Sequence, residues 1–431
     1  MEHQTVILIV FVLMMVLLLG GEWIFVALGG SAVIGLILLG SIMKLTPAVV
    51  WAAADSWELS CVPLFIFMGE IIFQSGLSRS LYESISLWLG RLPGGLLHTN
   101  VVASALFASV SGSTVATTAT IGTLAIPEQR RRGYSDNLIL GSIAASGSIG
   151  VLIPPSINMI LYAAWVQVSL GRLFMGGVIP GILISVLFMA YIGFAAWRKP
   201  ELAPVDTKKT LLREKIVGLS GIVPILVIVF IIWGGIYTGW MTPTEAAAVA
   251  AFAALAIAAI SRKLSWQSLN KSLLATVQIT CMTMSIYIGA KLLVTVVGFT
   301  GITEVLLNKI ADMNLGLLPT LFAVYGIYIV LGCFLDGIAL MLVTIPFLIP
   351  ILNFFSIDLI WFGVTLILLM QMSFITPPVG TNLYVVSAIA NAEITAVVKG
   401  ILPFFLLLFI GVLILTFFPS VVMFLPNTMT G

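Results

Sequence analysis

The stretch LFASVSGSTVATTATIG, residues 106–122, places a dense run of serine and threonine side chains and two glycines inside an otherwise apolar sequence. Glycine and small hydroxyl residues weaken a helix, because they give the backbone more freedom and other hydrogen-bond partners. A helix inside a lipid bilayer has no water to satisfy its backbone groups. The stretch therefore raises the question of whether a helix is meant to end near Ser111-Gly112-Ser113.

The composition predicts that the chain is embedded in a membrane. Its 431 residues are 60% apolar and only 8% charged, whereas a soluble domain carries about 25% charged residues. Apolar runs that approach the roughly 20 residues needed to cross a bilayer recur along the chain. They are residues 5–19, 23–43, 178–197, 222–237, 246–260, 273–297 and 401–418. We predict an all-α polytopic membrane protein whose first span is retained, since it lacks the basic start and cleavage site of a secretory signal.

The chain contains an internal duplication. Ile153-Pro154-Pro155-Ser156 resembles Thr376-Pro377-Pro378-Val379, and Gly177-Val178-Ile179-Pro180 resembles Gly400-Ile401-Leu402-Pro403. Both pairs have the same offset of 223 residues (377 − 154 and 400 − 177), which indicates a repeated unit. Each unit is predicted to begin with two spans, an amphipathic arm (44–59; 261–272) and a further span (60–75; 273–297). A hairpin, a span broken at Pro-Pro and a closing span complete it.

Basic residues give the orientation of the two units, because cytoplasmic loops are enriched in lysine and arginine. Asp312 and Asp358 mark the other side, with Lys309 nearby, whereas Lys44 and Arg172 fit the pattern less well. Counting spans between these markers predicts that the two repeats are inverted and that both termini lie outside the cytoplasm. The cytoplasmic markers are Arg130–Arg132, Arg198, Lys199, Lys208, Lys209, Arg213, Lys215, Arg262, Lys263 and Lys399.

Two pairs of short apolar segments are predicted to form re-entrant hairpins. Segments 96–110 and 114–126 are each too short to cross a bilayer comfortably, and they flank residues 111–113. Their counterparts are 317–331 and 338–351, with a turn at 332–337. A lone SGST could instead be a small-residue packing face, but paired interruptions in two repeats favour unwound backbone that lines a binding site.

The Pro-Pro sites interrupt crossing helices in the same way, although a single Pro-Pro usually only kinks a helix. Proline removes an amide donor, so carbonyls before Pro154 and Pro377 lose their partners. Such carbonyls and nearby hydroxyl groups are oxygen ligands that suit Na⁺, whereas the half-helix that resumes after each break suits a carboxylate. The candidate substrate-binding residues at these resumed half-helices are Ser156, Asn158, Thr381 and Asn382.

Ionisable residues inside the apolar runs are further candidates, because a charge within a membrane is costly. Lys291 lies in the middle of a span; it could meet a substrate carboxylate or pair with an acidic side chain between helices. Asp336 lies in the second hairpin turn; it could act at the cation and substrate site or cap the returning half-helix.

With these residues identified, the chain resembles the large membrane subunit of tripartite ATP-independent periplasmic transporters. The resemblance covers essentially the whole chain and is carried by SGSTVATTATIGTLAIPEQRRRGYS, GSIAASGSIGVLIPPS and FITPPVGTNLYV. Members that import sialic acid are the most similar. The resemblance implies a Na⁺-coupled elevator in the bacterial inner membrane, in which a transport part slides against a fixed scaffold. It implies no enzymatic activity and no nucleic-acid partner.

The resemblance also implies ligands and partners. The first Na⁺ site would use oxygens of Ser111, Ser113 or Thr114, Gly150, Ile153 and Pro154. The second would use Gly332, Thr376, Val379 and neighbours including Gly337. Two partners are implied, a small four-helix membrane subunit on a separate chain and a periplasmic substrate-binding protein that delivers a carboxylate.

The repeat and the resemblance together divide the chain into six parts, and they leave rival functions open. The rivals are a stand-alone Na⁺-coupled carboxylate symporter, a passive channel and an intramembrane protease. The predicted parts are scaffold and arm helices (1–89), half of the transport part (90–170), a connecting helix and cytoplasmic loop (171–215), scaffold and arm helices of repeat 2 (216–315), the other half of the transport part (316–395) and a C-terminal helix (396–431).

Overall fold

The computed structural model describes residues 3–204, 212–313 and 315–429, and every regular element in these ranges is a helix. The markers Lys208 and Lys209 lie outside the described residues. The helices of the first repeat are α1 (His3–Leu19), α2 (Ile24–Leu38), α3 (Thr46–Ala54), α4 (Cys61–Gln74), α5 (Leu77–Leu89), α6 (Leu96–Ser111), α7 (Thr114–Arg131), α8 (Asp136–Ser148), α9 (Ile157–Val166) and α10 (Leu170–Arg198).

The second repeat follows the same order. Its helices are α11 (Leu212–Gly218), α12 (Val223–Tyr237), α13 (Pro243–Ile260), α14 (Trp266–Thr300), α15 (Ile302–Asp312), α16 (Leu317–Gly332), α17 (Gly337–Phe354), α18 (Leu359–Ser373), α19 (Thr381–Ala390), α20 (Ile394–Phe417) and α21 (Ser420–Thr428). The predicted all-helical fold with two hairpins and two interrupted helices is confirmed.

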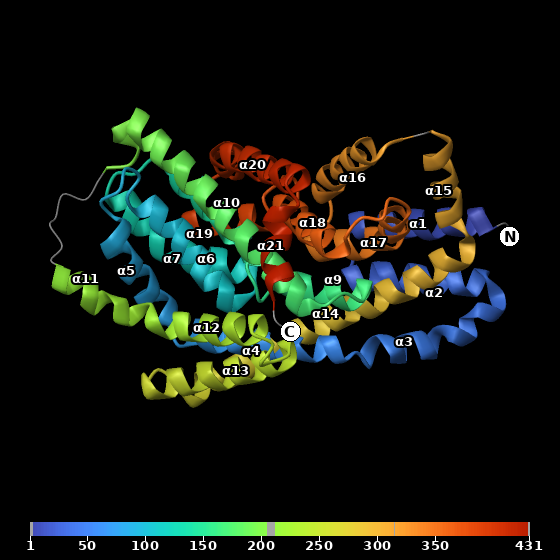
Figure 1. Ribbon diagram of the computed structural model, residues 1–431, viewed down its shortest axis with the longest axis horizontal. Coiled ribbons are helices and arrows are strands. Elements are labelled where there is room, and N and C mark those ends of the chain that lie inside the picture. Colours follow the sequence, from blue (N-terminus) through green and yellow to red (C-terminus); the bar gives the residue numbers. More distant parts are fainter. Residues whose placement is uncertain (1–2, 205–211, 314, 430–431) are drawn as a thin grey trace.

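The helices form two groups. Helices α2, α3, α4, α12, α13 and α14 lie along the lower edge of Figure 1, and we call them the lower row. The hairpins α6–α7 and α16–α17 lie above it with the broken helices α8–α9 and α18–α19, and α10 and α20 cross the top. Among the described residues, six helices are long and apolar enough to cross a membrane, or seven if a bent pair counts as one span.

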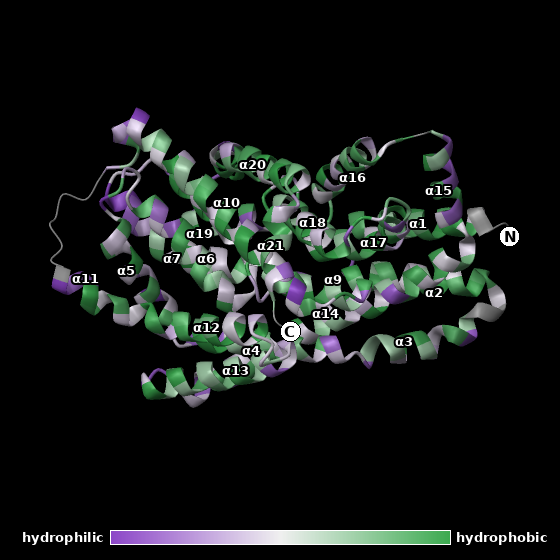
Figure 2. Ribbon diagram, viewed as in Figure 1, coloured by the Kyte–Doolittle hydropathy of each residue, from purple (hydrophilic) through white to green (hydrophobic). Residues whose placement is uncertain are grey.

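Apolar residues predominate in most of the helices. Figure 2 shows apolar residues over most of the ribbon and polar residues gathered where α10 ends and α11 begins. Large apolar side chains such as Phe230 and Phe252 are exposed, as expected where lipid replaces water around the helices.

Two span boundaries differ from the prediction. The run 23–43 is not one helix, because α2 ends at Leu38 and a 3-10 turn follows from Gly40, whose φ is +77°. From Trp266 onward, the predicted arm 261–272 and the span 273–297 belong to one continuous helix, α14, of 35 residues. The change in hydropathy at Leu273 does not end a helix, since neither glycine nor proline interrupts the segment there.

The first repeat does break where the second is continuous. Helix α3 ends at Ala54, and a 3-10 turn from Trp57 to Ser60 separates it from α4. Asp55 and Ser56 stand in this gap, and both residue types favour local hydrogen bonds over helix continuation. In this part of the repeat the offset is 220 residues, since Cys61 and Gly69 recur as Cys281 and Gly289. The positions that correspond to Asp55 and Ser56 are therefore Ala275 and Thr276, which lie within α14.

The matched glycines of the repeats bring the closing helices onto the broken helices. A Cβ atom on Gly400 of α20 would collide with the carbonyl oxygen of Asn137 in α8, and one on Gly177 of α10 would meet the carbonyl oxygen of Leu152. Backbone contact this close requires the absence of a side chain. The duplicated Gly-x-x-Pro motif therefore packs closing helices against broken ones.

Candidate functional site

The first hairpin turns at the opening stretch. Helix α6 ends at Ser111, Gly112 adopts φ +61°, and α7 begins at Thr114. The side chain of Ser113 accepts a hydrogen bond from the amide of Ala116 at 3.3 Å, which caps α7. The hydroxyl groups of Ser111 and Thr117 lie 2.9 Å apart. The hydroxyl residues thus close the turn and end one half-helix as the other begins.

The first broken helix lies directly against this turn. Helix α8 gives way to a 3-10 turn at residues 149–151, and α9 resumes at Ile157 after the cis Pro154–Pro155 bond. A Cβ atom on Gly112 would lie 3.1 Å from the Pro155 carbonyl oxygen. One on Gly150 would lie 3.6 Å from the Ser113 carbonyl oxygen. The turn of the first hairpin and the first helix break, which together supply the first predicted Na⁺ site, therefore lie in contact.

The second hairpin and break meet in the same way. The amide of Val379 donates a hydrogen bond to the carbonyl of Cys333, 3.1 Å away, and so joins the break to the hairpin turn. A Cβ atom on Gly332 would lie 2.9 Å from Cβ of Ser373. Thr376 lies in this break, where its hydroxyl donates to the carbonyl of Met372 at 2.6 Å.

Asp336 caps the returning half-helix of the second hairpin. Its carboxylate accepts a hydrogen bond from the amide of Ile338 at 3.3 Å, and α17 begins at Gly337. A Cβ atom on Gly337 would lie 2.8 Å from the ring of Phe374, beside the break. The capping interpretation is confirmed; a role of Asp336 toward substrate stays a prediction.

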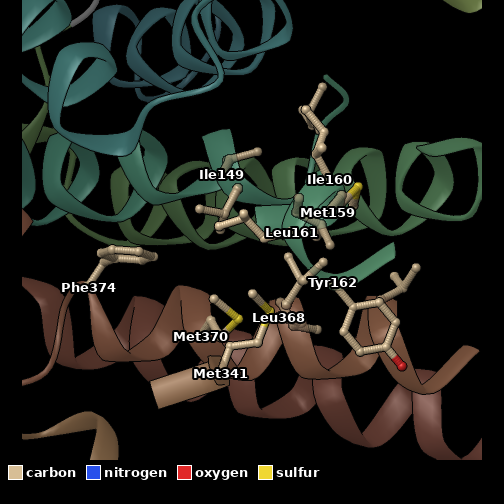
Figure 3. Close-up of a cluster of buried hydrophobic side chains, with 14 of the residues drawn as sticks. Ile149, Met159, Ile160, Leu161, Tyr162, Met341, Leu368, Met370 and Phe374 are labelled. Carbon is tan, nitrogen blue, oxygen red and sulfur yellow. The ribbon is translucent and has the colours of Figure 1, made fainter. Parts of the chain in front are cut away.

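The two repeats interlock through their broken helices. The hydroxyl of Tyr162 on α9 donates to the carbonyl of Leu359 on α18. The side-chain amide of Asn382 on α19 donates to the carbonyl of Ala144 on α8. These distances are 2.7 and 3.1 Å. Figure 3 shows apolar side chains of both repeats, among them Met159 and Leu368, gathered in one buried cluster. The hairpins and broken helices therefore pack as one unit.

Several predicted substrate-binding residues carry buried polar atoms that have no hydrogen-bond partner among the residues the structure describes. These include Oγ of Ser156, Oγ1 of Thr381 and Oδ1 of Asn382, all next to a break. Leaving a buried polar atom unpaired costs about 1–3 kcal/mol, so such atoms mark places where a ligand or water would be stabilising. Asn158 is also buried, in the first turn of α9.

Gln371 is a candidate that the sequence reasoning missed. It is fully buried on α18, and both polar atoms of its amide lack a partner within the described residues. The signal was a lone glutamine in the apolar run LILLMQMSF just before the second break. Other unpartnered atoms, such as Oγ of Ser272 on α14, lie away from the breaks.

Lys291, on α14, lies apart from both breaks. Its side chain reaches the end of α9 that is farther from the first break. It lines a cavity of about 420 Å³ with Asp55, Glu58 and Gln167, among others. Its ammonium group lies 4.3 Å from the ring centroid of Trp165, a cation–π arrangement. Within the described residues it has no ion pair with an acidic side chain, so the structure does not show the alternative in which Lys291 pairs with an acid between helices.

Comparison with known proteins identifies the family. Residues 11–421 match the family described as "Tripartite ATP-independent periplasmic transporter, DctM component". The chain belongs to this family. It is a polytopic protein of the bacterial inner membrane, and it is a transporter permease component rather than a member of an enzyme family.

Named relatives of this TRAP permease differ in substrate. The C4-dicarboxylate TRAP transporter large permease protein DctM of Pseudomonas aeruginosa is 34% identical, over 87% of each chain. The sialic acid large permease SiaM of Vibrio cholerae is 32% identical over 88% of each. The isethionate permease DctMQ of Oleidesulfovibrio alaskensis is 33% identical over 94% of this chain, which spans 64% of that longer protein.

Solved structures support the fold of the permease. The YdaH transporter of Alcanivorax borkumensis matches with a TM-score of 0.61 at 15% identity, over 90% of this chain and 89% of that one. MtrF of Neisseria gonorrhoeae matches with a TM-score of 0.54 at 14% identity, over 89% and 84% of the two chains. At this identity the similarity concerns the fold alone.

Proposed function

We propose that this permease couples the entry of Na⁺ to the import of a small carboxylate, by an elevator movement of the hairpins and broken helices against the lower row. The observation that carries the proposal is the pairing of each hairpin turn with a helix break, twice in one chain. Beside both breaks lie buried oxygens that no other group in the described ranges contacts by a hydrogen bond. Paired broken helices in repeated halves are typical of secondary transporters that bind their cargo there.

The chemistry of the breaks suits Na⁺ as the driving ion. The first site would draw on the hairpin and break residues Ser111, Ser113, Thr114, Gly150, Ile153 and Pro154. The second would draw on Gly332, Gly337, Thr376 and Val379. Carbonyl and hydroxyl oxygens are suitable ligands for a hard cation, and one charge moving down the membrane potential supplies about 2.3 kcal/mol per 100 mV.

The start of each resumed half-helix suits the substrate's carboxylate. Helices α9 and α19 begin beside the breaks, and the first amides of a helix have no partner within it. In α19 the backbone amide of Asn382 donates instead to the carbonyl of Phe374. Ser156, Asn158, Thr381 and Asn382 lie in or next to these first turns. The relatives are named for sialic acid, C4-dicarboxylates and isethionate, which are all small organic anions. We propose sialic acid as the carboxylate to test first.

The family name describes a three-part transporter, and we propose that the other two parts are separate chains. One is a small four-helix membrane subunit that widens the lower row within the bilayer. The other is a periplasmic binding protein that selects the substrate and delivers it. Lys291, in its cavity at the end of α9, would attract the carboxylate before it reaches the breaks.

Reconstitution tests this function. With both partners in liposomes, uptake of radiolabelled sialic acid should require external Na⁺ and fall to background when K⁺ replaces it, because K⁺ does not fit a Na⁺ cage. It should also require the binding protein. Equal uptake in K⁺ would contradict the coupling, and uptake without the binding protein would favour a stand-alone symporter. A panel with malate, succinate and isethionate identifies the substrate.

A further inference from the structure

A tryptophan of the lower row donates a hydrogen bond to the first break. The indole Nε1–H of Trp233, on α12, points to the carbonyl oxygen of Pro154 at 2.9 Å. This is the carbonyl of the Pro154–Pro155 peptide bond itself, at the point where α8 has ended and α9 has not begun. One polar contact therefore joins the lower row to the unwound backbone of the first site.

The same broken helix is also bonded to the lower row beyond its break. The hydroxyl of Tyr287 on α14 donates to the carbonyl of Ala164 on α9 at 3.3 Å. The rings of Tyr287 and Trp165 meet edge to face, with centroids 5.2 Å apart. The first broken helix is thus bonded to the lower row at its interruption and again along α9.

The second break has no such connection. The carbonyl of Pro378 accepts a hydrogen bond from the hydroxyl of Tyr384, at 2.7 Å, within the same broken helix. Within the residues that the structure describes, no side chain of the lower row donates to this break. The duplication therefore preserves the breaks but not their attachment to the lower row.

We propose that Trp233 is a positioning residue that opposes cation binding at the first site while it holds the moving unit to the lower row. The inference rests on the proposed Na⁺ coupling and deepens it. The Pro154 oxygen has two lone pairs, so the indole N–H and the cation can both bind it, but each draws electron density from the same atom and so weakens the other's interaction. By linkage, Na⁺ at this oxygen loosens the Trp233 bond and so weakens the attachment of the broken helix to the lower row at its interruption.

Trp233→Phe tests the competition, because it removes the N–H and keeps most of the ring. In the assembled membrane complex in detergent, the thermal unfolding midpoint is recorded against Na⁺ concentration, with choline keeping the ionic strength constant. The Na⁺ concentration for half of the stabilisation should fall roughly two- to tenfold, the range that one neutral hydrogen bond allows. The Na⁺ dependence of uptake should shift likewise, with the substrate KM at saturating Na⁺ unchanged.

Trp240→Phe is the matched control, since Trp240 follows α12 and is 83% exposed; its Na⁺ midpoint should equal that of the wild type. An unchanged or higher Na⁺ midpoint in Trp233→Phe overturns the inference while the coupling itself stands. If the wild type shows no Na⁺-dependent stabilisation or uptake, the proposed function fails instead. Trp233→Met removes the same donor and replaces the first variant if that one does not assemble.

Discussion

Gly112 is the residue on which the first hairpin turns. Its φ of +61° lies in the left-handed region, where a side chain costs about 1–2 kcal/mol. A Cβ atom there would also lie 3.1 Å from the Pro155 carbonyl oxygen. The position thus serves two needs at once, a turn in the hairpin and close approach to the break.

Gly112→Ala should lower both stability and transport. The left-handed strain alone should cost about 1–2 kcal/mol, and the new methyl group should push the hairpin away from the break. Gly133→Ala is the matched control, because Gly133 also has a positive φ (+78°) but its Cβ would meet nothing within 4 Å. Thermal unfolding should fall in both variants, whereas Na⁺-driven uptake should fall strongly only in Gly112→Ala. Equal uptake in the two would argue against a role of the hairpin–break contact.

Sequence reasoning at this scale found residues whose chemistry is visible locally. Ser111, Pro154 and Pro377 disrupt helices by their own nature, so the interruptions were predictable. Trp233 could not be found in this way, because its role depends on a carbonyl 79 residues away. The cavity around Lys291 was equally hidden, since it is formed by separate elements.

At the scale of elements, the closing helices depend on glycine at their contact with the broken helices. Gly400 of α20 approaches the backbone of α8 at Asn137, and Gly141 of α8 approaches Gly400 in return. Here backbone meets backbone across the two repeats. A backbone carbonyl cannot move aside as a flexible side chain can, so added volume must separate the helices.

Gly400→Ala should therefore destabilise the protein by about 1–3 kcal/mol, the usual cost of overpacking. Gly326→Ala is the control, since Gly326 lies inside α16 and its Cβ would meet nothing within 4 Å; it should leave stability unchanged or raise it slightly. Thermal unfolding of the purified protein in detergent measures both. A Gly400→Ala variant as stable as the wild type would show that α8 and α20 can shift freely.

The repeat predicted the order of elements but not their continuity. Both arms were expected to be separate from the spans that follow. Only the arm of the first repeat is separate from its span, because α3 ends before Asp55 and Ser56. At the corresponding positions of the second repeat, α14 continues without a break. A change in hydropathy along the sequence indicates that a helix enters different surroundings. It does not indicate that the helix ends there.

At the scale of the whole molecule, the lower row approaches the first hairpin closely where α4 passes Ser111. A Cβ atom on Gly69 of α4 would lie 2.9 Å from the Cα atom of Ser111. An elevator movement of the hairpin requires this contact to separate. The contact therefore offers a test of the proposed motion.

Gly69→Ala should disturb this contact, because its Cβ would lie 2.9 Å from Cα of Ser111 and 3.0 Å from the carbonyl oxygen of Val110. Overpacking of this kind costs about 1–3 kcal/mol, so the thermal unfolding midpoint should fall and Na⁺-driven uptake should change with it. Gly298→Ala on α14 is the control, because its Cβ would meet nothing within 4 Å. Equal stability and equal uptake in the two variants would contradict a role of the α4–hairpin contact in transport.

The uninterrupted helix α14 has a mechanical consequence. Its 35 residues make a rod about 52 Å long at 1.5 Å per residue, whereas the hydrocarbon layer is about 30 Å thick. Such a rod must lean steeply or project from the lipid, and its inclination responds to acyl-chain length. Tyr287 of α14 is hydrogen-bonded to α9. A change in bilayer thickness that tilts α14 therefore also displaces the broken helix of the first repeat.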